Sequence, residues 1–202
     1  MNIIDISNDL LTAEVYQGDP VPELERVKKL GEGSAYNLSV LSACLHNGTH
    51  ADAPLHFLED GFSVDEYALE KFIGPCKVIT MSPGIITGQA VEEYFPRDCS
   101  RILIKSSGRA FLHYTAAEVM SLYGYELVGT DANSIESDGE DGRTHRTLLS
   151  HDIAILEGLN LSGVETGEYF LIAPPVKISE AEASFTRALL ISDYIFWSKK
   201  GK

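Results

Sequence analysis

Three of the six histidines of this chain fall within eleven residues, and this cluster constrains the local backbone more than any other feature of the sequence. A His-x-x-x-His spacing could place two imidazoles on one face of a helix. Gly48 and Pro54 lie inside the segment and argue against an uninterrupted helix. The polar side chains that need an explanation are His46, His50, Asp52 and His56.

These four positions have the same parity, so an extended chain would point their side chains to one side. A straight strand cannot be the whole answer, because ten extended residues span roughly 33 Å. Metal ligands lie only about 2 Å from their ion. We therefore predict an extended entry over Tyr36–Leu45, followed by a loop that curls at Gly48 and Pro54.

Imidazoles combined with a carboxylate suit zinc first, and manganese or iron second. The alternative is that these histidines are scattered surface or core residues without a common ligand. They stand between an apolar strand and the apolar segment Pro54-Leu55-His56-Phe57, where unpaired polar groups would be costly to desolvate. The segment therefore predicts a metal site.

The ordered pattern His46-x-Gly48-Thr49-His50-x-Asp52-x-Pro54-x-His56-Phe57 resembles the signature of the cyclase family of metal-dependent hydrolases, which includes kynurenine formamidase (arylformamidase) and isatin hydrolase. The resemblance extends over most of the chain through Asp5-Ile6-Ser7, Gly18-Asp19-Pro20, Leu127 to Ala132, and His145 to Leu161. It implies one α/β domain over residues 1–202, with a mixed sheet like the swivelling β/β/α fold of that family.

The resemblance also implies a set of site residues. In the family a second His and a Glu, twelve residues apart, complete a two-metal site, and His145 and Glu157 have this separation. His46, His50 and Asp52 would bind one ion, and Asp52, His145 and Glu157 the other, with Asp52 or Glu157 bridging. His56 would be the general acid/base. His151 remains a competing partner for Glu157, and Glu157 could instead be an exposed residue at a strand end.

The implied reaction is hydrolysis of a carbon–nitrogen amide bond, of the arylformamidase type that acts on N-formylkynurenine. Alternatives are cyclic amides, lactones, or a metal-binding scaffold without catalysis. Tyr16-Gln17 stands where formamidases of the family carry Trp-Pro, so we expect Tyr16 to form an aromatic wall for the substrate. Two divalent ions, zinc or else manganese, and a homodimer or homotetramer are implied by resemblance alone.

Composition excludes several other classes of protein. The formal net charge is −14, which repels the phosphate backbone of nucleic acids and anionic membranes. No eighteen apolar residues run together, and the first residues lack a signal-peptide pattern, so we expect a cytoplasmic protein. Cys44, Cys76 and Cys99 have the spacing of neither a disulfide framework nor a zinc ribbon and are expected to be reduced.

The order of apolar runs and turn signals predicts short strands and helices in one layered domain. The expected strands are Ile3–Ser7, Tyr36–Leu45, Cys76–Met81, Arg101–Lys105, Glu126–Thr130, Ile153–Leu156, Gly167–Ile172 and Ala188–Ile191. The expected helices are Ser63–Ile73, Thr87–Tyr94, Thr115–Tyr123 and Arg143–Asp152. Thr115 and Glu118 have capping-box spacing, and Gly31-Glu32-Gly33-Ser34 predicts a hairpin turn.

Overall fold

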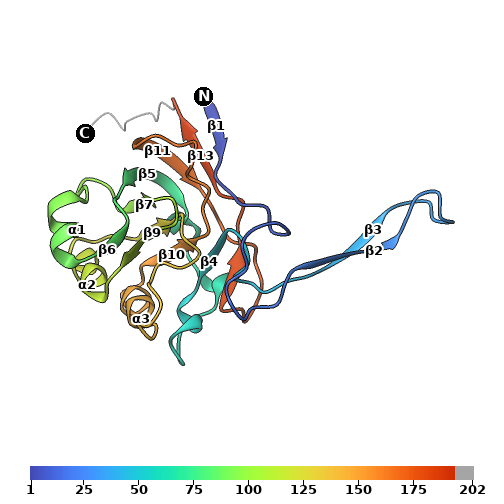
Figure 1. Cartoon of the computed structure of the whole chain (residues 1–202), viewed down its shortest axis with the longest axis horizontal. Helices are drawn as coiled ribbons and strands as arrows, with labels where there is room; N and C mark the ends of the chain where they lie inside the picture. Colours follow the sequence, from blue (N-terminus) through green and yellow to red (C-terminus); the bar gives the residue numbers. More distant parts are fainter. Residues whose placement is uncertain (194–202) are drawn as a thin grey trace, which may run out of the picture.

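A nine-stranded mixed sheet curls through the body of the molecule in this computed structural model, which describes residues 1–193 (Figure 1). The strand order is β1-β13-β11-β5-β7-β9-β10-β4-β12. The strands are β1 (Asn2–Asp5), β4 (His50–Asp52), β5 (Ile73–Thr80), β7 (Arg101–Lys105), β9 (Leu127–Thr130), β10 (Ala154–Glu157), β11 (Gly167–Ile172), β12 (Ala183–Phe185) and β13 (Leu189–Ser192). The four strands from β5 to β10 in this order are parallel, and the other pairs are antiparallel. The predicted single α/β domain is confirmed.

The centre of the sheet is covered on both faces, which explains why its strands are continuously apolar. In β7, Ile102 and Ile104 enter one core, whereas Leu103 enters the other. The first core lies under three helices on one side of the sheet (Figure 1). These helices are α1 (Gly88–Tyr94), α2 (Tyr114–Leu122) and α3 (Arg143–Ser150), and a short parallel pair, β6 (Gly84–Ile86) and β8 (Ala110–Leu112), runs beside them.

The prediction of a helix over Ser63–Ile73 is wrong. This segment forms two 3₁₀ turns, η2 (Val64–Glu66) and η3 (Leu69–Lys71), and β5 already begins at Ile73. Ser63 and Glu66 do form a capping box, but Tyr67 is extended and ends the turn. The buried Tyr67 ring packs into the second core, and its hydroxyl donates to the carbonyl oxygen of Asp52. Tertiary packing therefore overrides the helical pattern here.

The prediction that Thr115 is the N-cap of α2 is also wrong. The helix begins at Tyr114, and its N-cap is His113, whose ring accepts a hydrogen bond from the backbone of Thr115. Thr115 lies inside the helix and accepts from the backbone of Gly88, which joins α2 to α1. The prediction for α1 is confirmed, because Thr87 is its N-cap.

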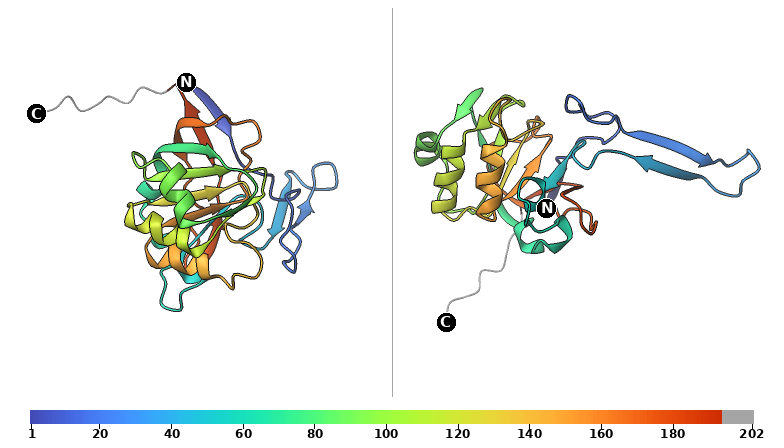
Figure 2. Two further views of the ribbon diagram at one scale, coloured as in Figure 1. Left: turned by 60° about the vertical axis from the view of Figure 1, so that its left-hand side comes forward. Right: turned by 90° about the horizontal axis from the view of Figure 1, so that it is seen from below.

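A hairpin arm projects from the body (Figures 1 and 2). It consists of β2 (Glu23–Lys28) and β3 (Leu38–Ser42), and every residue of both strands is exposed. The predicted strand Tyr36–Leu45 is thus shorter and lies outside the main sheet, whereas the turn at Gly31–Ser34 is confirmed. The strands β2, β4, β6, β8 and β12 were not predicted from the sequence.

Within residues 1–193 no helix is long and apolar enough to cross a membrane. The three cysteines are free thiols, as expected from their spacing.

Candidate metal centre

The register between two strands brings His50 and Glu157 together. His50 begins β4 and Glu157 ends β10, and the two residues are paired directly opposite each other in the antiparallel ladder. Their side chains therefore share one face of the sheet, and His50 Nε2 lies 3.4 Å from Glu157 Oε2. Asp52 is two residues after His50, so it points to the same face, with Oδ1 3.4 Å from the same nitrogen.

The bends on either side of β4 bring in the other two histidines. Gly48 has a φ of 65°, and the turn before it places His46 Nδ1 3.1 Å from Asp52 Oδ1. After β4, the 3₁₀ turn η1 (Pro54–His56) returns His56 to the site, with its ring centroid 4.1 Å from that of His46. The loop curls at the two predicted positions.

His145 enters from α3 on the other side of the same carboxylates. Its Nε2 lies 3.1 Å from Glu157 Oε1 and 3.9 Å from Asp52 Oδ2. Two groups of three side chains result, and within each group one ligand atom per residue lies within 4.8 Å of the others. One group is His46, His50 and Asp52, and the other is Asp52, His145 and Glu157. Asp52 is common to both groups, as in the ligand sets that the family resemblance implies.

Several nitrogen and oxygen atoms of these groups are placed to bind a cation rather than to form hydrogen bonds with one another. Within residues 1–193, His46 Nε2, His50 Nε2 and both carboxylate oxygens of Asp52 are buried without a hydrogen-bond partner. Buried polar atoms without a partner are costly, so several of them at one point fit a binding site for a cation. Three imidazole and carboxylate donors around each point match the ligand preferences of zinc.

The ionisable side chains of the cluster shift one another's pKa values when no cation is present. Burial alone would lower the pKa of His50, but the carboxylates of Asp52 and Glu157 raise it to about 10. Burial also opposes the charge of His145, whereas Glu136 and Glu157 raise its pKa to about 10. Burial would raise the pKa of Asp52, yet the imidazoles beside it lower this pKa well below its usual range. The carboxylates therefore remain ionised and available to a cation.

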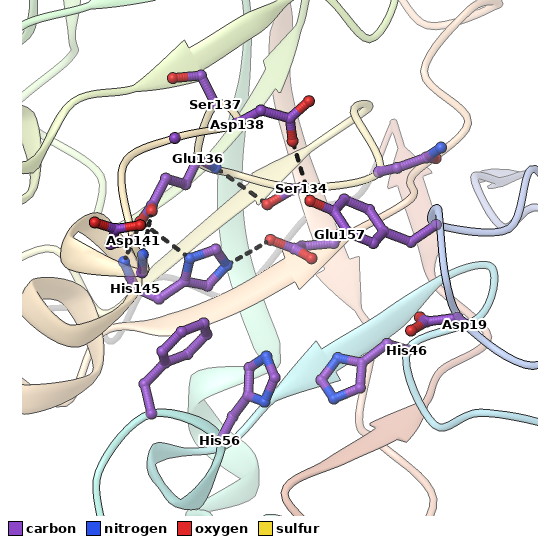
Figure 3. A pocket seen from close by; sticks show the side chains of 15 residues that line it. Asp19, His46, His56, Ser134, Glu136, Ser137, Asp138, Asp141, His145 and Glu157 are labelled. Atoms are coloured by element: carbon purple, nitrogen blue, oxygen red, sulfur yellow. Dashed lines mark hydrogen bonds and ion pairs between the residues drawn. The ribbon is translucent and has the colours of Figure 1, made fainter.

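Three members of the cluster, His46, His145 and Glu157, form the floor of an open cavity of about 420 Å³ (Figure 3). His46 and His56 face His145 and Glu157 across this cavity. Phe57 stacks on the ring of His145 at a centroid distance of 4.6 Å and forms part of the wall. His56 belongs to neither ligand group, and burial lowers its pKa.

Tyr16 lies at the rim of the cavity, where the sequence predicted an aromatic wall. Its ring is half exposed, and its hydroxyl donates to Asp138 Oδ1 at 3.0 Å. This contact joins the loop after β1 to the loop between β9 and α3, which are 122 residues apart in sequence. The hydrogen bond to Asp138 raises the pKa of Tyr16.

The structure separates the competing histidines. His145 is buried in the cluster, whereas His151 is exposed at the end of α3 and contacts the carbonyl oxygen of Thr147. His113 caps α2. Glu157 is only 4% exposed, so it is not a solvated residue at a strand end.

Two carboxylates near the cluster were missed by the sequence analysis. Glu182 precedes β12, and its Oε1 lies 3.7 Å from His46 Nε2. Glu136 is buried beside His145, with Oε2 3.2 Å from Nδ1. Neither has a sequence signal of its own, because both lie in polar loop segments that come close to the ligands only in the folded chain.

The model of the family described as "Putative cyclase" matches residues 4–137, about two thirds of the chain. The chain belongs to the cyclase family. One relative is kynurenine formamidase from Erythrobacter litoralis (strain HTCC2594). It is 34% identical to this chain, and the match covers 93% of this chain and 93% of the relative.

Solved structures agree with this membership of the cyclase family. A protein described as a potential metal-dependent hydrolase with cyclase activity superposes with a TM-score of 0.83 and 28% identity, covering 94% of this chain and 96% of its own. Isatin hydrolase A from Labrenzia aggregata gives a TM-score of 0.80 over 94% of this chain and 93% of its own. At 22% identity, the latter shows a shared fold only.

Proposed function

We propose that this chain is a two-metal amidohydrolase that cleaves the carbon–nitrogen bond of an N-formyl arylamine or a similar amide. One observation carries the proposal: two three-residue groups share the buried Asp52, members of both groups line an open cavity, and several of their buried donor atoms have no partner within residues 1–193. A site of purely structural zinc is usually closed by four protein ligands. Here each group supplies three and faces the cavity.

His46, His50 and Asp52 would bind one divalent ion, and Asp52, His145 and Glu157 the second. Zinc suits this mixture of imidazole and carboxylate best, and manganese is the alternative. Such ions acidify a water molecule and polarise the carbonyl group of the substrate. Asp52 is the bridging carboxylate in this assignment, because it alone belongs to both groups.

His56 would be the general acid/base. Its ring is next to His46 at 4.1 Å and 6.2 Å from the ring of His145, so it faces the floor of the cavity without belonging to a ligand group. Its lowered pKa favours the neutral imidazole near neutral pH. That imidazole accepts a proton from the attacking water and returns it to the amine nitrogen as the carbon–nitrogen bond breaks.

The cavity supports an aryl amide as the substrate. Its volume of about 420 Å³ falls in the range of small-molecule sites. Phe57 and Tyr16 supply aromatic walls on two sides. The 34% identical kynurenine formamidase supports N-formyl arylamines as the first class to test, with N-formylkynurenine among them.

The decisive experiment measures hydrolysis and metal content together. The protein is purified without chelator, supplied with zinc or manganese, and assayed with N-formylkynurenine, formanilide, isatin and a small cyclic amide. We expect the linear formyl amides to be cleaved, and a chelator to abolish the activity. Cleavage of the cyclic compounds alone would favour the cyclic-amide alternative. Bound metal without any hydrolysis would favour a non-catalytic scaffold.

We also propose a homodimer or homotetramer in which the arm is the contact surface. A two-stranded hairpin alone is only marginally stable in water, and this one exposes apolar side chains on both faces. Leu24 and Leu41 are paired opposite each other and are 50% and 45% exposed. The arm carries equal numbers of acidic and basic residues, so two arms can meet without the repulsion that the acidic bodies would cause.

A further inference from the structure

Glu136 lies in the loop between β9 and α3, and only 6% of its surface is exposed. Its carboxylate accepts hydrogen bonds from four nitrogens at the start of α3. Oε1 accepts from the backbone of Gly142 at 2.6 Å, and Oε2 accepts from the backbone of Thr144 at 2.7 Å and of His145 at 3.1 Å. The fourth contact joins Oε2 to the imidazole Nδ1 of His145 at 3.2 Å.

The fourth contact determines how the imidazole is used. An ionised carboxylate only accepts hydrogen bonds, so Nδ1 of His145 must carry the proton that it donates to Glu136. The other nitrogen, Nε2, forms a hydrogen bond with Glu157 Oε1 at 3.1 Å (Figure 3) and lies 3.9 Å from Asp52 Oδ2, so without a cation it carries a proton as well. A cation bound by the second ligand group would replace the proton on Nε2, and the imidazole would then keep its one proton on Nδ1, where Glu136 accepts it.

The residue before Glu136 forms a hydrogen bond with Glu157, another ligand of the same group. The backbone N–H of Ile135 donates to Glu157 Oε1 at 2.6 Å. Two consecutive residues thus fix His145 and Glu157, although these ligands come from a helix and a strand. His50 has a different arrangement, because its Nδ1 contacts a backbone acceptor, the carbonyl oxygen of Gly48, at 3.0 Å.

We propose that Glu136 is a positioning residue for the second ion: it holds His145 with Nδ1 protonated and Nε2 facing Asp52 and Glu157. This inference rests on the proposed function, since it concerns the ion assigned to that group. The simpler explanation is that Glu136 only satisfies the free N–H groups at the start of α3. That role accounts for the three backbone contacts and leaves the contact with Nδ1 without a purpose.

Glu136→Gln tests the proposal, because the amide has the same size and lacks the charge. Zinc dissociation constants are measured by competition with a chelating dye. We expect one of the two constants to rise 10- to 100-fold, the usual effect of losing such an outer carboxylate, and the other to stay within about threefold. Glu136→Asp, which keeps the carboxylate, should restore part of the affinity. Glu140→Gln removes the same charge from the same loop and should leave both constants unchanged.

Wild-type affinity for both ions in a folded Glu136→Gln protein would overturn the positioning role and leave only the helix cap. A second measurement covers the case in which this variant does not fold. Long-range ¹H–¹⁵N spectra of the zinc-supplemented wild-type protein should show His145 protonated at Nδ1. A proton on Nε2 would overturn the inference in the intact protein. Failure of the wild type itself to bind two ions would instead overturn the proposed function.

Discussion

Gly158 lies so close to Gly48 that a Cβ atom on Gly158 would be 2.3 Å from the carbonyl oxygen of Gly48. Gly158 directly follows Glu157, and Gly48 lies in the turn that leads to His50. Both glycines have left-handed backbones, with φ values of 63° and 65°. The close approach of these two glycines therefore sets the distance between the segments that carry the ligands.

Replacing Gly158 by Ala should destabilise the protein by about 2–5 kcal/mol. A left-handed alanine costs about 1–2 kcal/mol, and the contact with backbone atoms requires a shift that costs about 1–3 kcal/mol. Urea unfolding in the presence of a chelator measures this change without a contribution from bound metal. Gly163→Ala is the matched control, because nothing lies within 4 Å of its added Cβ, and it should change stability by less than about 0.5 kcal/mol. Equal effects of the two substitutions would contradict the proposed close approach.

Metal analysis should find two ions per chain after supplementation with zinc or manganese. His145→Ala should preferentially empty one site, because His145 belongs to one ligand group only. His151→Ala should leave both sites filled, since this side chain is exposed and belongs to neither group. A single ion that does not increase on supplementation, or the reverse effect of the two substitutions, would contradict the assignment.

The sequence indicated which residues belong to the candidate site, but it did not indicate how these residues are arranged in space. Histidines and an aspartate at close spacing were sufficient to indicate a metal site, and the separation of His145 and Glu157 matched the family. The pairing of His50 opposite Glu157 was not predictable, because β4 is only three residues long and lacks an apolar pattern. Glu136 was missed for a different reason: its function depends on contacts with a helix that begins seven residues later.

Strands with continuous apolar runs were predicted well, and Arg101–Lys105 and Gly167–Ile172 have the predicted bounds. The errors lie where tertiary packing overrides local preference. The spacing of apolar residues over Ser63–Ile73 suits a helix, but Tyr67 and Phe72 are drawn into the core from an irregular segment. The strand β2 was missed for the opposite reason, because it is exposed throughout and, within residues 1–193, belongs to a two-stranded sheet with β3 outside the core.

Tyr16→Ala should raise the KM for an N-formyl arylamine by about tenfold, and Tyr16→Phe should change it by less than about threefold. Covering part of an aromatic side chain with substrate contributes about 1.4 kcal/mol, which corresponds to the tenfold effect. The phenylalanine keeps the ring and loses only the hydrogen bond to Asp138. Steady-state kinetics with metal content measured in parallel test this prediction. An equal loss in both variants would mean that the hydroxyl is the important group.

The arm should determine the oligomeric state. Leu24→Glu combined with Leu41→Glu places two like charges on one face of the arm and should convert an oligomer to a monomer, measured by light scattering after size-exclusion chromatography. Metal content should not change. Leu122→Glu is the control, because this leucine is 81% exposed at the end of α2, far from the arm in sequence. If the wild type is itself a monomer, the arm is not a contact between copies.

Replacing His56 by Asn should separate catalysis from metal binding. Asparagine is polar and of similar size but cannot carry a proton near neutral pH, so both ions should remain while turnover falls roughly 10²- to 10⁴-fold. His50→Ala is the comparison within the same motif, because it removes a direct donor and should lower metal occupancy. Loss of metal in step with activity in His56→Asn would show that His56 is a ligand.

The pH profile gives an independent test of the same residue. Burial lowers the pKa of His56, which means that the folded protein favours its neutral form. The neutral form is the base, so activity should be complete above this pKa and should be lost as the pH falls through it. The acidic limb of kcat/KM is therefore expected below the reference value of about 6.5. In His56→Asn this limb should disappear or move. An unchanged limb in a variant with reduced activity would assign the titration to another group, and full activity with both ions bound would show that the proton travels by a different route.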